Sequence, residues 1–232
     1  MIVLAVDSTG PVAGVAVAED RKILCEVSGN LGLTHSETLQ PMIDWVMAQA
    51  RLTVAQVDLF ACVAGPGSFT GVRIGVCAIK AIAQATSKPC VALDALEVLA
   101  AQHFGFDGVI CPILDARRGQ VYGAQFAFEK GSAPVRLAKD DVLKLEDFVA
   151  QLPENGRVLF VGDGAQVHAR AIGQLLGARA LIAPDHLAQL RAGAACFLAP
   201  DKPACDYLTL APIYLRAPQA EREREPRLER HG

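Results

Sequence analysis

The sequence feature that most constrains the fold is an apolar strand pattern that runs through a glycine-rich loop directly into a helix pattern. Residues 58–64 read Asp-Leu-Phe-Ala-Cys-Val-Ala, a short run of strand-forming residues. Gly-Pro-Gly at 65–67 ends this run, and a helical pattern follows over 70–86. Either Ser68 or Thr70 can cap the helix, because a side-chain oxygen there accepts an unpaired backbone N–H. The stretch therefore predicts a strand, a tight loop and a helix.

The predicted helix 70–86 is apolar on nearly all sides. Its strongly polar residues fall within one narrow stripe at about 100° per residue; they are Arg73, Lys80 and Gln84. Such a helix must be buried on two sides. One side can be the sheet of its own domain, and the other can be a second helix of that domain or a helix of another chain. Small residues at 71, 75 and 78 allow close approach in both cases, so the pattern leaves both open.

The composition is that of a compact α/β protein without a strong charge bias. The chain has 232 residues, which suggests one or two domains, with a hydrophobic share of 52% and a formal net charge of −3. A protein that grips nucleic acid by itself normally needs a clustered basic face, and the sequence contains no such cluster. The composition therefore argues against unaided binding of nucleic acid.

The start of the chain and its cysteines indicate a cytoplasmic protein. Residues 1–18 are apolar but contain Asp7 and a Gly-Pro turn, without the basic start or small-residue cleavage site of a signal peptide. We expect no association with a membrane. The seven cysteines include no Cys-x-x-Cys pair, so we expect buried thiols in a reducing compartment rather than a disulfide or zinc framework.

The chain consists of two halves that follow the same order of elements. Each half opens with a strand that ends in aspartate and a turn, adds further strands, and then alternates helix and strand. The predicted elements of the first half are strands 2–7, 12–18, 22–27, 58–64 and 89–93, and helices 35–50, 70–86 and 94–104, the first of which starts at a Thr-His-Ser-Glu capping box. Those of the second half are strands 109–115, 120–128, 134–138, 157–161 and 179–182, and helices at 146–152, up to 176 and from 185.

This repeat predicts two related α/β domains that face a cleft. We place the N-terminal domain at 1–105 and the C-terminal domain at 106–215. Residues 216–232 alternate Glu and Arg without an apolar period, so they form a charged tail that either returns to the first domain or is disordered.

Five motifs, in the right order, resemble the bacterial TsaB (YeaZ) family over most of the chain. They are LAVDSTG at 4–10, HSETLQPMI at 35–43, GPGSFTGVRIGV at 65–76, DARRGQVY at 115–122 and APIYLR at 211–216. The resemblance implies two domains of the actin-like, ribonuclease-H-like superfamily that also contains sugar kinases and Hsp70. It also implies a function as the non-catalytic partner of TsaD, which makes threonylcarbamoyladenosine beside the anticodon of tRNA.

The resemblance implies protein partners rather than catalysis by this chain. We expect a TsaD-like catalytic subunit, a TsaE-like ATPase, a homodimer when the chain is alone, and tRNA contact only through the complex. Helices 35–50 and 70–86 are expected to pack against the equivalent pair of TsaD. The residues expected at this interface are Leu39, Ile43, Trp45, Arg73, Val76, Ile79 and Lys80.

The resemblance also implies the remains of a nucleotide site. The superfamily holds phosphates and metal on two strand–Asp–turn motifs and adenosine on a third loop. The corresponding residues are Asp7, Ser8, Thr9, Asp115, Gly162, Asp163 and Gly164. Turn N–H groups and carboxylates suit ATP with Mg²⁺, although an aspartate before Ser-Thr-Gly is also an ordinary turn. We expect no firmly bound cofactor, and Arg117 and Arg118 either fill the cleft or pair with neighbouring carboxylates.

One departure from TsaD separates this chain from the catalytic partner. TsaD carries two metal-binding histidines one helical turn apart, where this chain has Asp94 and Glu97. Asp94 as a helix cap with Glu97 at the capping-box position explains both residues. We therefore expect no metal site and no catalytic residue.

Two enzymatic alternatives remain. A stand-alone ATP-dependent kinase would suit the architecture, but it needs a catalytic base beyond Asp7 and Asp115. A glycoprotease-like hydrolase would have to use Ser8, Ser68 and His35, none of which lies in a Gly-x-Ser-x-Gly motif.

Overall fold

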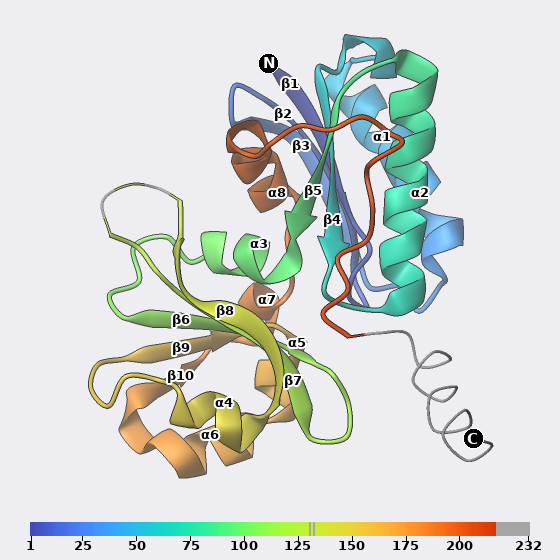
Figure 1. Cartoon of the computed structure of the whole chain (residues 1–232). Helices are drawn as coiled ribbons and strands as arrows, with labels where there is room; N and C mark the ends of the chain where they lie inside the picture. The colour runs from blue at the N-terminus through green and yellow to red at the C-terminus, as the bar shows by residue number, and fades with distance from the viewer. Residues whose placement is uncertain (130, 132, 217–232) are drawn as a thin grey trace, which may run out of the picture.

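The computed structural model describes residues 1–216 except 130 and 132, and it contains two α/β domains (Figure 1). The sheet of the first domain has the strand order β3-β2-β1-β4-β5. Its strands are β1 Ile2–Asp7, β2 Ala13–Glu19, β3 Lys22–Gly29, β4 Leu59–Gly65 and β5 Cys90–Asp94. β1, β2 and β3 pair in antiparallel fashion, whereas β4 and β5 run parallel to β1. The predicted three-strand opening is confirmed.

The second sheet repeats this plan in the order β8-β7-β6-β9-β10. Its strands are β6 Val109–Asp115, β7 Gln120–Ala127, β8 Val135–Lys144, β9 Val158–Val161 and β10 Ala180–Ile182. Again three strands pair in antiparallel fashion, and the last two run parallel to the first. β8 is longer than the predicted strand 134–138, because its alternation of half-buried and exposed residues continues to Lys144.

Two helices cover the outer face of the first sheet, α1 His35–Ala50 and α2 Phe69–Thr86. They lie side by side against it (Figure 1). The alternation along β4 produces this layer, since Phe60 and Cys62 face α1 and α2 while Ala61 and Val63 face the other way. Ser68 caps α2 by accepting a hydrogen bond from Gly71 N at 3.3 Å. The sequence left open whether the second side of α2 packs on a helix of its own domain or on another chain. In the structure α2 contacts α1 of the same domain, and part of α2 stays exposed.

The opposite face of the first sheet is covered by α3 Ala95–Ala101 and α8 Ala192–Leu198. The same apolar cluster includes Ile110, Phe126 and Val161 of the second sheet. The two domains therefore share one continuous core through α3. On its far side the second sheet is covered by α4 Leu145–Ala150 and α6 Ala169–Leu176, whose apolar residues form a separate cluster.

The loop after β9 is followed by two short helices rather than the single helix predicted up to residue 176. α5 Asp163–Val167 ends at His168, which is also the N-cap of α6. The helix predicted from residue 185 is only the short α7 Asp185–Ala188. The chain then becomes extended at Gln189 before it enters α8.

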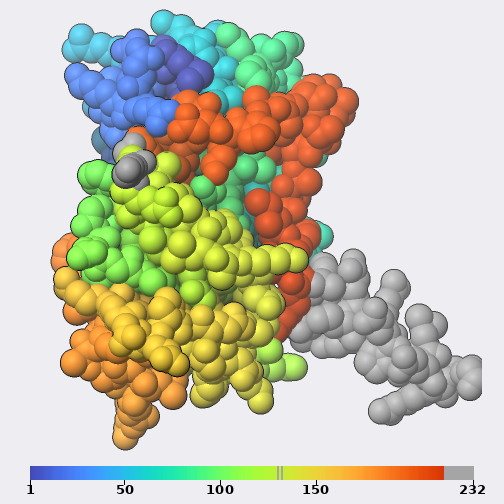
Figure 2. Space-filling view, turned by 60° about the vertical axis from the view of Figure 1, so that its left-hand side comes forward, coloured from blue at the N-terminus to red at the C-terminus, as the bar shows by residue number. Residues whose placement is uncertain are grey.

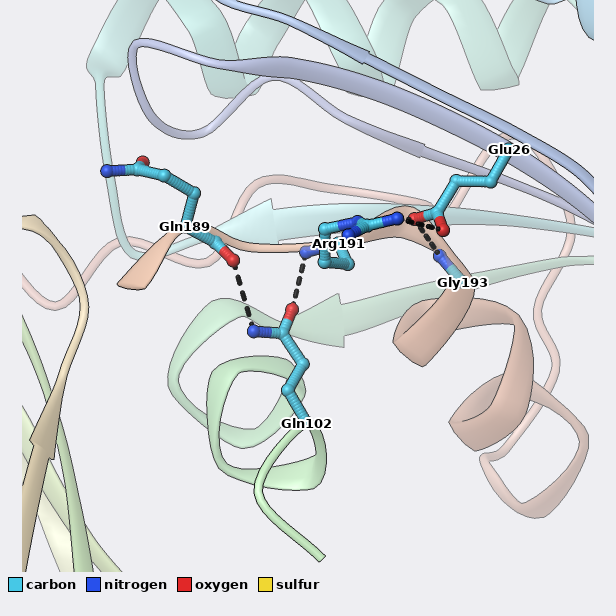
Figure 3. Close-up of polar contacts among 5 residues, drawn as sticks. All are labelled: Glu26, Gln102, Gln189, Arg191 and Gly193. Atoms are coloured by element: carbon cyan, nitrogen blue, oxygen red, sulfur yellow. Dashed lines mark hydrogen bonds and ion pairs between the residues drawn. The ribbon is translucent and has the colours of Figure 1, made fainter. Parts of the chain in front are cut away.

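The predicted domain boundary at residue 215 is wrong, because the chain returns to the first domain at Arg191. The side chain of Glu26 on β3 accepts hydrogen bonds from Arg191 Nη2 at 2.7 Å and from Gly193 N at 3.0 Å. The Gln102 amide, at the end of α3, donates to Gln189 O and accepts from Arg191 N (Figure 3). The second domain thus ends near residue 190, and α8 belongs to the first.

Residues 202–216 form a C-terminal strap on the first domain. The strap crosses the domain surface beyond α8 and then runs down beside α2 toward the cleft (Figures 1 and 2). It pairs with β5 through Cys205, and Ile213 N donates to Ala64 O at 2.7 Å. Of the charged tail predicted at 216–232, residues 217–232 lie outside the described residues.

Within the described part of the chain, no helix combines the length and the apolar character needed to cross a membrane.

Candidate functional site

A cleft of about 1230 Å³ separates the two domains at the carboxyl ends of β1 and β6. Of the seven residues expected in the vestigial nucleotide site, four line this cleft: Asp7, Thr9, Asp115 and Asp163. The two sheets bring them together because β1 and β6 occupy equivalent central places. The lining does not include Ser8, Gly162 or Gly164. The sequence thus predicted where the cleft lies and four of the polar residues that line it.

The carboxylate of Asp7 is buried and already has its hydrogen-bond donors. Thr9 donates to Asp7 Oδ1 from its backbone N at 2.9 Å and from its hydroxyl at 2.7 Å. Burial raises the pKa of Asp7 to about 6, although the bonds from Thr9 and the nearby His35 act in the opposite direction. The N–H of Thr9, which a phosphate would need, is therefore engaged within the turn.

The loop before α2 lies directly on this first turn. Ser68 N donates to Thr9 O at 2.7 Å, and Ser8 Oγ donates to Gly71 O at 2.8 Å. A Cβ on Gly71 would collide with the Ser8 carbonyl oxygen, and one on Gly75 would lie 2.6 Å from Ser8 Oγ. The glycines of the loop and helix thus serve the close packing of α2 on the end of β1, and Ser8 is used in that packing.

The second turn is held by its own aspartate. Arg117 N donates to Asp115 Oδ1 at 2.9 Å, and Arg117 and Arg118 both have left-handed backbone conformations, with φ of 63° and 55°. Asp115 N in turn donates to Asp163 Oδ1 at 3.1 Å. Burial raises the pKa of Asp163, an effect opposed by the bond from Asp115 N. No described acidic side chain forms a salt bridge with Arg117 or Arg118, and Arg117 lines the cleft.

The third loop of the expected nucleotide site is packed against β6. Gly162 has φ of 95°, and a Cβ there would collide with Ile113 O. A Cβ on Gly164 would lie 2.9 Å from the same oxygen. The two glycines are therefore explained by close approach of the loop to the sheet.

The strap adds cleft residues to which the sequence analysis assigned no role. Tyr214 stacks on Phe69 with ring centroids 5.3 Å apart, and its hydroxyl accepts a hydrogen bond from Arg73 Nε at 2.9 Å. Arg216 reaches across the cleft and donates to Ala116 O at 3.4 Å and to Gln120 Oε1. Both residues belong to the APIYLR motif at 211–216, and this motif was the only sign in the sequence analysis that they could have a role.

The polar groups of the cleft fit ATP with Mg²⁺ poorly. In the first turn, the Asp7 carboxylate accepts a hydrogen bond from Thr9 N. In the second turn, Ala116 O accepts a hydrogen bond from Arg216 of the strap. Among the described residues, His, Cys, Asp and Glu form no group of three that could hold a metal ion. Of the three residues that a hydrolase would have to use, Ser8 is buried against α2, Ser68 Oγ accepts the capping hydrogen bond of α2, and His35 Nε2 contacts Gly10 O at 2.8 Å.

Asp94 caps α3 as predicted, but the Glu97 side chain does not complete a capping box. Asp94 Oδ1 accepts a hydrogen bond from Glu97 N at 2.8 Å. Glu97 itself pairs with Lys202 of the strap at 2.6 Å. Asp94 also lies 3.5 Å from Arg136 of the second domain, so this position carries structural contacts of both domains.

Four of the seven expected interface residues lie in the core of the first domain. The exposed fraction is 2% for Leu39, 1% for Ile43, 3% for Val76 and 0% for Ile79. The expectation that these four contact a partner is therefore wrong. Their helix faces point toward the first sheet, a direction that the all-round apolar pattern of α2 could not specify for Val76 and Ile79.

The remaining three lie on the outside of α1 and α2. Trp45 is 49% exposed, Arg73 is held by Tyr214, and Lys80 donates to Leu208 O of the strap at 3.5 Å. Cys77, Ala81 and Ala85 form an exposed stripe of small residues along α2. The outer face of α1 and α2 is defined here by its exposed apolar residues: Pro41, Trp45, Ala48, Cys77, Ala81 and Ala85.

The chain is similar over most of its length to proteins named for one tRNA modification. A family model described as TsaD, tRNA N6-adenosine threonylcarbamoyltransferase, matches residues 31–220. The tRNA threonylcarbamoyladenosine biosynthesis protein TsaB of Bacillus subtilis is 33% identical over 222 residues, which cover 95% of this chain and 96% of the relative. The TsaB of Haemophilus influenzae is 30% identical over 193 residues, covering 79% and 80%.

Solved structures share the fold. YeaZ from Pseudomonas aeruginosa matches with a TM-score of 0.78 at 22% identity and covers 92% of this chain and 99% of its own. The ethanolamine utilization protein EutJ from Carboxydothermus hydrogenoformans matches with a TM-score of 0.52 at 13% identity, covering 85% and 89%. The fold class predicted from the sequence, two related actin-like α/β domains facing a cleft, is confirmed.

Proposed function

Since the chain belongs to the TsaB family, whose members are named for threonylcarbamoyladenosine biosynthesis in tRNA, we propose that it is the non-catalytic subunit that pairs with a TsaD-type threonylcarbamoyltransferase. A role in this modification pathway follows from the family. The pairing and the lack of catalysis are our proposal. Two observations support the proposal. Polar groups of the cleft form hydrogen bonds with one another, whereas the outer face of α1 and α2 is left exposed by the described part of the chain.

The outer face of α1 and α2 has the features of a helix-packing surface. The exposed stripe of Cys77, Ala81 and Ala85 allows the backbone of another helix to approach closely, and Trp45 offers a large aromatic anchor. The partner that fits is a second pair of helices with the same arrangement, as in a protein of the same fold. Because the face can meet a copy of itself, we propose that the isolated chain forms a homodimer through it.

We also propose the other partners that the family resemblance implies. A TsaE-type ATPase would join the assembled pair rather than this chain alone, and tRNA would be held by the complex. The net charge of −3 fits a subunit that does not bind RNA by itself.

Binding to the TsaD-type protein of the same organism tests the proposal. Ala81→Glu places a charge in the middle of the exposed stripe of α2 and should raise the Kd at least about 100-fold, because a charge buried without a partner is costly. The same variant should convert the homodimer to a monomer. Substitution of Val76 or Ile79 is unsuitable, since it would disturb the core.

Leu175→Glu is the matched control. Leu175 is 46% exposed on α6 of the second domain, so the new charge stays in water. The variant should bind like the wild type, and urea unfolding should show that both variants are folded. Unchanged affinity of folded Ala81→Glu would rule out the outer face as the interface.

A further inference from the structure

Two cysteines face each other where the strap joins the edge of the first sheet. Cys90 N donates to Cys205 O at 2.9 Å, and Cys205 N donates to Cys90 O at 2.8 Å. The two residues form an isolated antiparallel bridge, and their Sγ atoms are 3.8 Å apart. Both thiols are free. The contact joins residues that are far apart in the sequence.

The backbone geometry at this bridge suits a disulfide bond. In an antiparallel pair that exchanges both hydrogen bonds the Cα atoms lie about 5.5 Å apart. Disulfides span Cα distances of about 4.4–6.8 Å, and their S–S bond of about 2.05 Å requires the two sulfurs to approach by less than about 2 Å. Cys205 lies outside helices and regular strands, so the strap can supply this small movement.

The two thiols differ in access to solvent. Cys90 is fully buried, and burial together with the hydrogen bond to Cys205 raises the pKa of Cys90 to about 12. Cys205 is half-buried and packs against the apolar cluster of the first domain. Lys80 and Asp206 are the charged groups beside the pair, with opposite effects on Cys90. Cys205 is therefore the thiol that meets a reagent first.

We propose that Cys90 and Cys205 form a reversible disulfide when the chain reacts with a low-molecular-weight disulfide. The thiolate of Cys205 attacks one sulfur of the small molecule, forms a mixed disulfide and releases one thiol. The sulfur of Cys90 then attacks the sulfur of Cys205, the bond to the small molecule breaks, and a second thiol leaves with the proton of Cys90. Two protein thiols are oxidised while the small disulfide is reduced to two thiols.

This bond fixes the start of the strap. Between residues 205 and 216 the strap is held by single contacts, such as Ile213 N to Ala64 O and Lys80 to Leu208 O. Its later part carries Tyr214 and lines the cleft. A covalent link to β5 closes a long chain loop around the entire second domain, so oxidation restricts the unfolded chain and stabilises the protein.

Oxidised glutathione is the probe, applied in excess to the purified full chain, with free thiols then blocked by N-ethylmaleimide. We expect peptide mapping to show a linked pair of Cys90 and Cys205, and the Tm to rise by at least about 5 °C. Dithiothreitol should reverse both changes. Cys77→Ser, which removes an exposed thiol on α2, should leave the link intact.

Cys205→Ser should form no link and should gain no thermal stability from glutathione, while its reduced Tm stays near that of the reduced wild type. The proposal is overturned if glutathione remains attached to Cys205 without release, or if Cys90 is found unmodified after Cys205 has reacted. It is also overturned if the only disulfides formed join two chains. These readouts are independent of any binding partner.

Discussion

Asp7 carries a carboxyl group into the interior at the end of β1, with an exposed fraction of 2%. Its pKa rises from 3.8 to about 6, so the folded chain holds this proton more tightly than the unfolded chain. The stability therefore falls as the pH rises from about 3.8 to 6, and above that range the ionised group costs about 3 kcal/mol.

Asp7→Asn should raise the free energy of unfolding at pH 7.5 by about 1–3 kcal/mol, because the amide oxygen still accepts the bonds from Thr9 without the cost of burying a charge. At pH 4 the gain should nearly vanish. Urea unfolding at both pH values measures this. Asp44→Asn on the exposed side of α1 should change either value by less than about 0.5 kcal/mol. A less stable Asp7→Asn protein at pH 7.5 would mean that a cation compensates the charge.

At the scale of elements, periodicity predicted the strands and main helices because each buries one face in an alternating or helical pattern. It failed where a helix is apolar all round. The buried face of α2 carries Gly71 and Gly75, which contact Ser8, together with Val76 and Ile79, which were expected outside. α8 was missed as part of the first domain because its small apolar residues reveal no face at all.

Gly71→Ala should destabilise the protein by about 3 kcal/mol, since a methyl group there collides with the Ser8 carbonyl oxygen and must push α2 away from β1. Gly173→Ala is the matched control. Gly173 lies in α6 with open space around it, and alanine should stabilise that helix by about 0.5–1 kcal/mol. Chemical denaturation compares the two. Equal effects would show that α2 is not packed as closely as described.

At the scale of the whole molecule, the two domains are joined by three elements that sequence order alone does not bring together. These elements are α3, which lies in the core shared by the two sheets, the segment at 189–193, which bonds to Gln102, and the strap, whose Arg216 bonds to Ala116 of the second domain. The repeat of strand order was predictable from the two strand–Asp–turn motifs, and so was the cleft. The return of the chain at Arg191 was not, because it depends on Glu26, a distant residue with no local signal.

Gln102→Ala should lower the free energy of unfolding by about 1–3 kcal/mol, because Gln189 O and Arg191 N lose their shared partner. Gln174→Ala, at an exposed position on α6, should change it by less than about 0.5 kcal/mol. Denaturation followed by probes in both domains gives the result. A Gln102→Ala protein as stable as the control would mean that the connection is held by Glu26 alone.

We propose that this protein works through its outer helix face and not through its cleft. The most direct measurement is the threonylcarbamoyladenosine content of tRNA from cells depleted of this chain and supplied with variants at equal protein levels. Depletion should remove the nucleoside. Wild type, Leu175→Glu and the cleft variant Asp115→Asn should restore it, whereas Ala81→Glu should not. Restoration by Ala81→Glu together with failure of Asp115→Asn would contradict the account and return the function to the cleft.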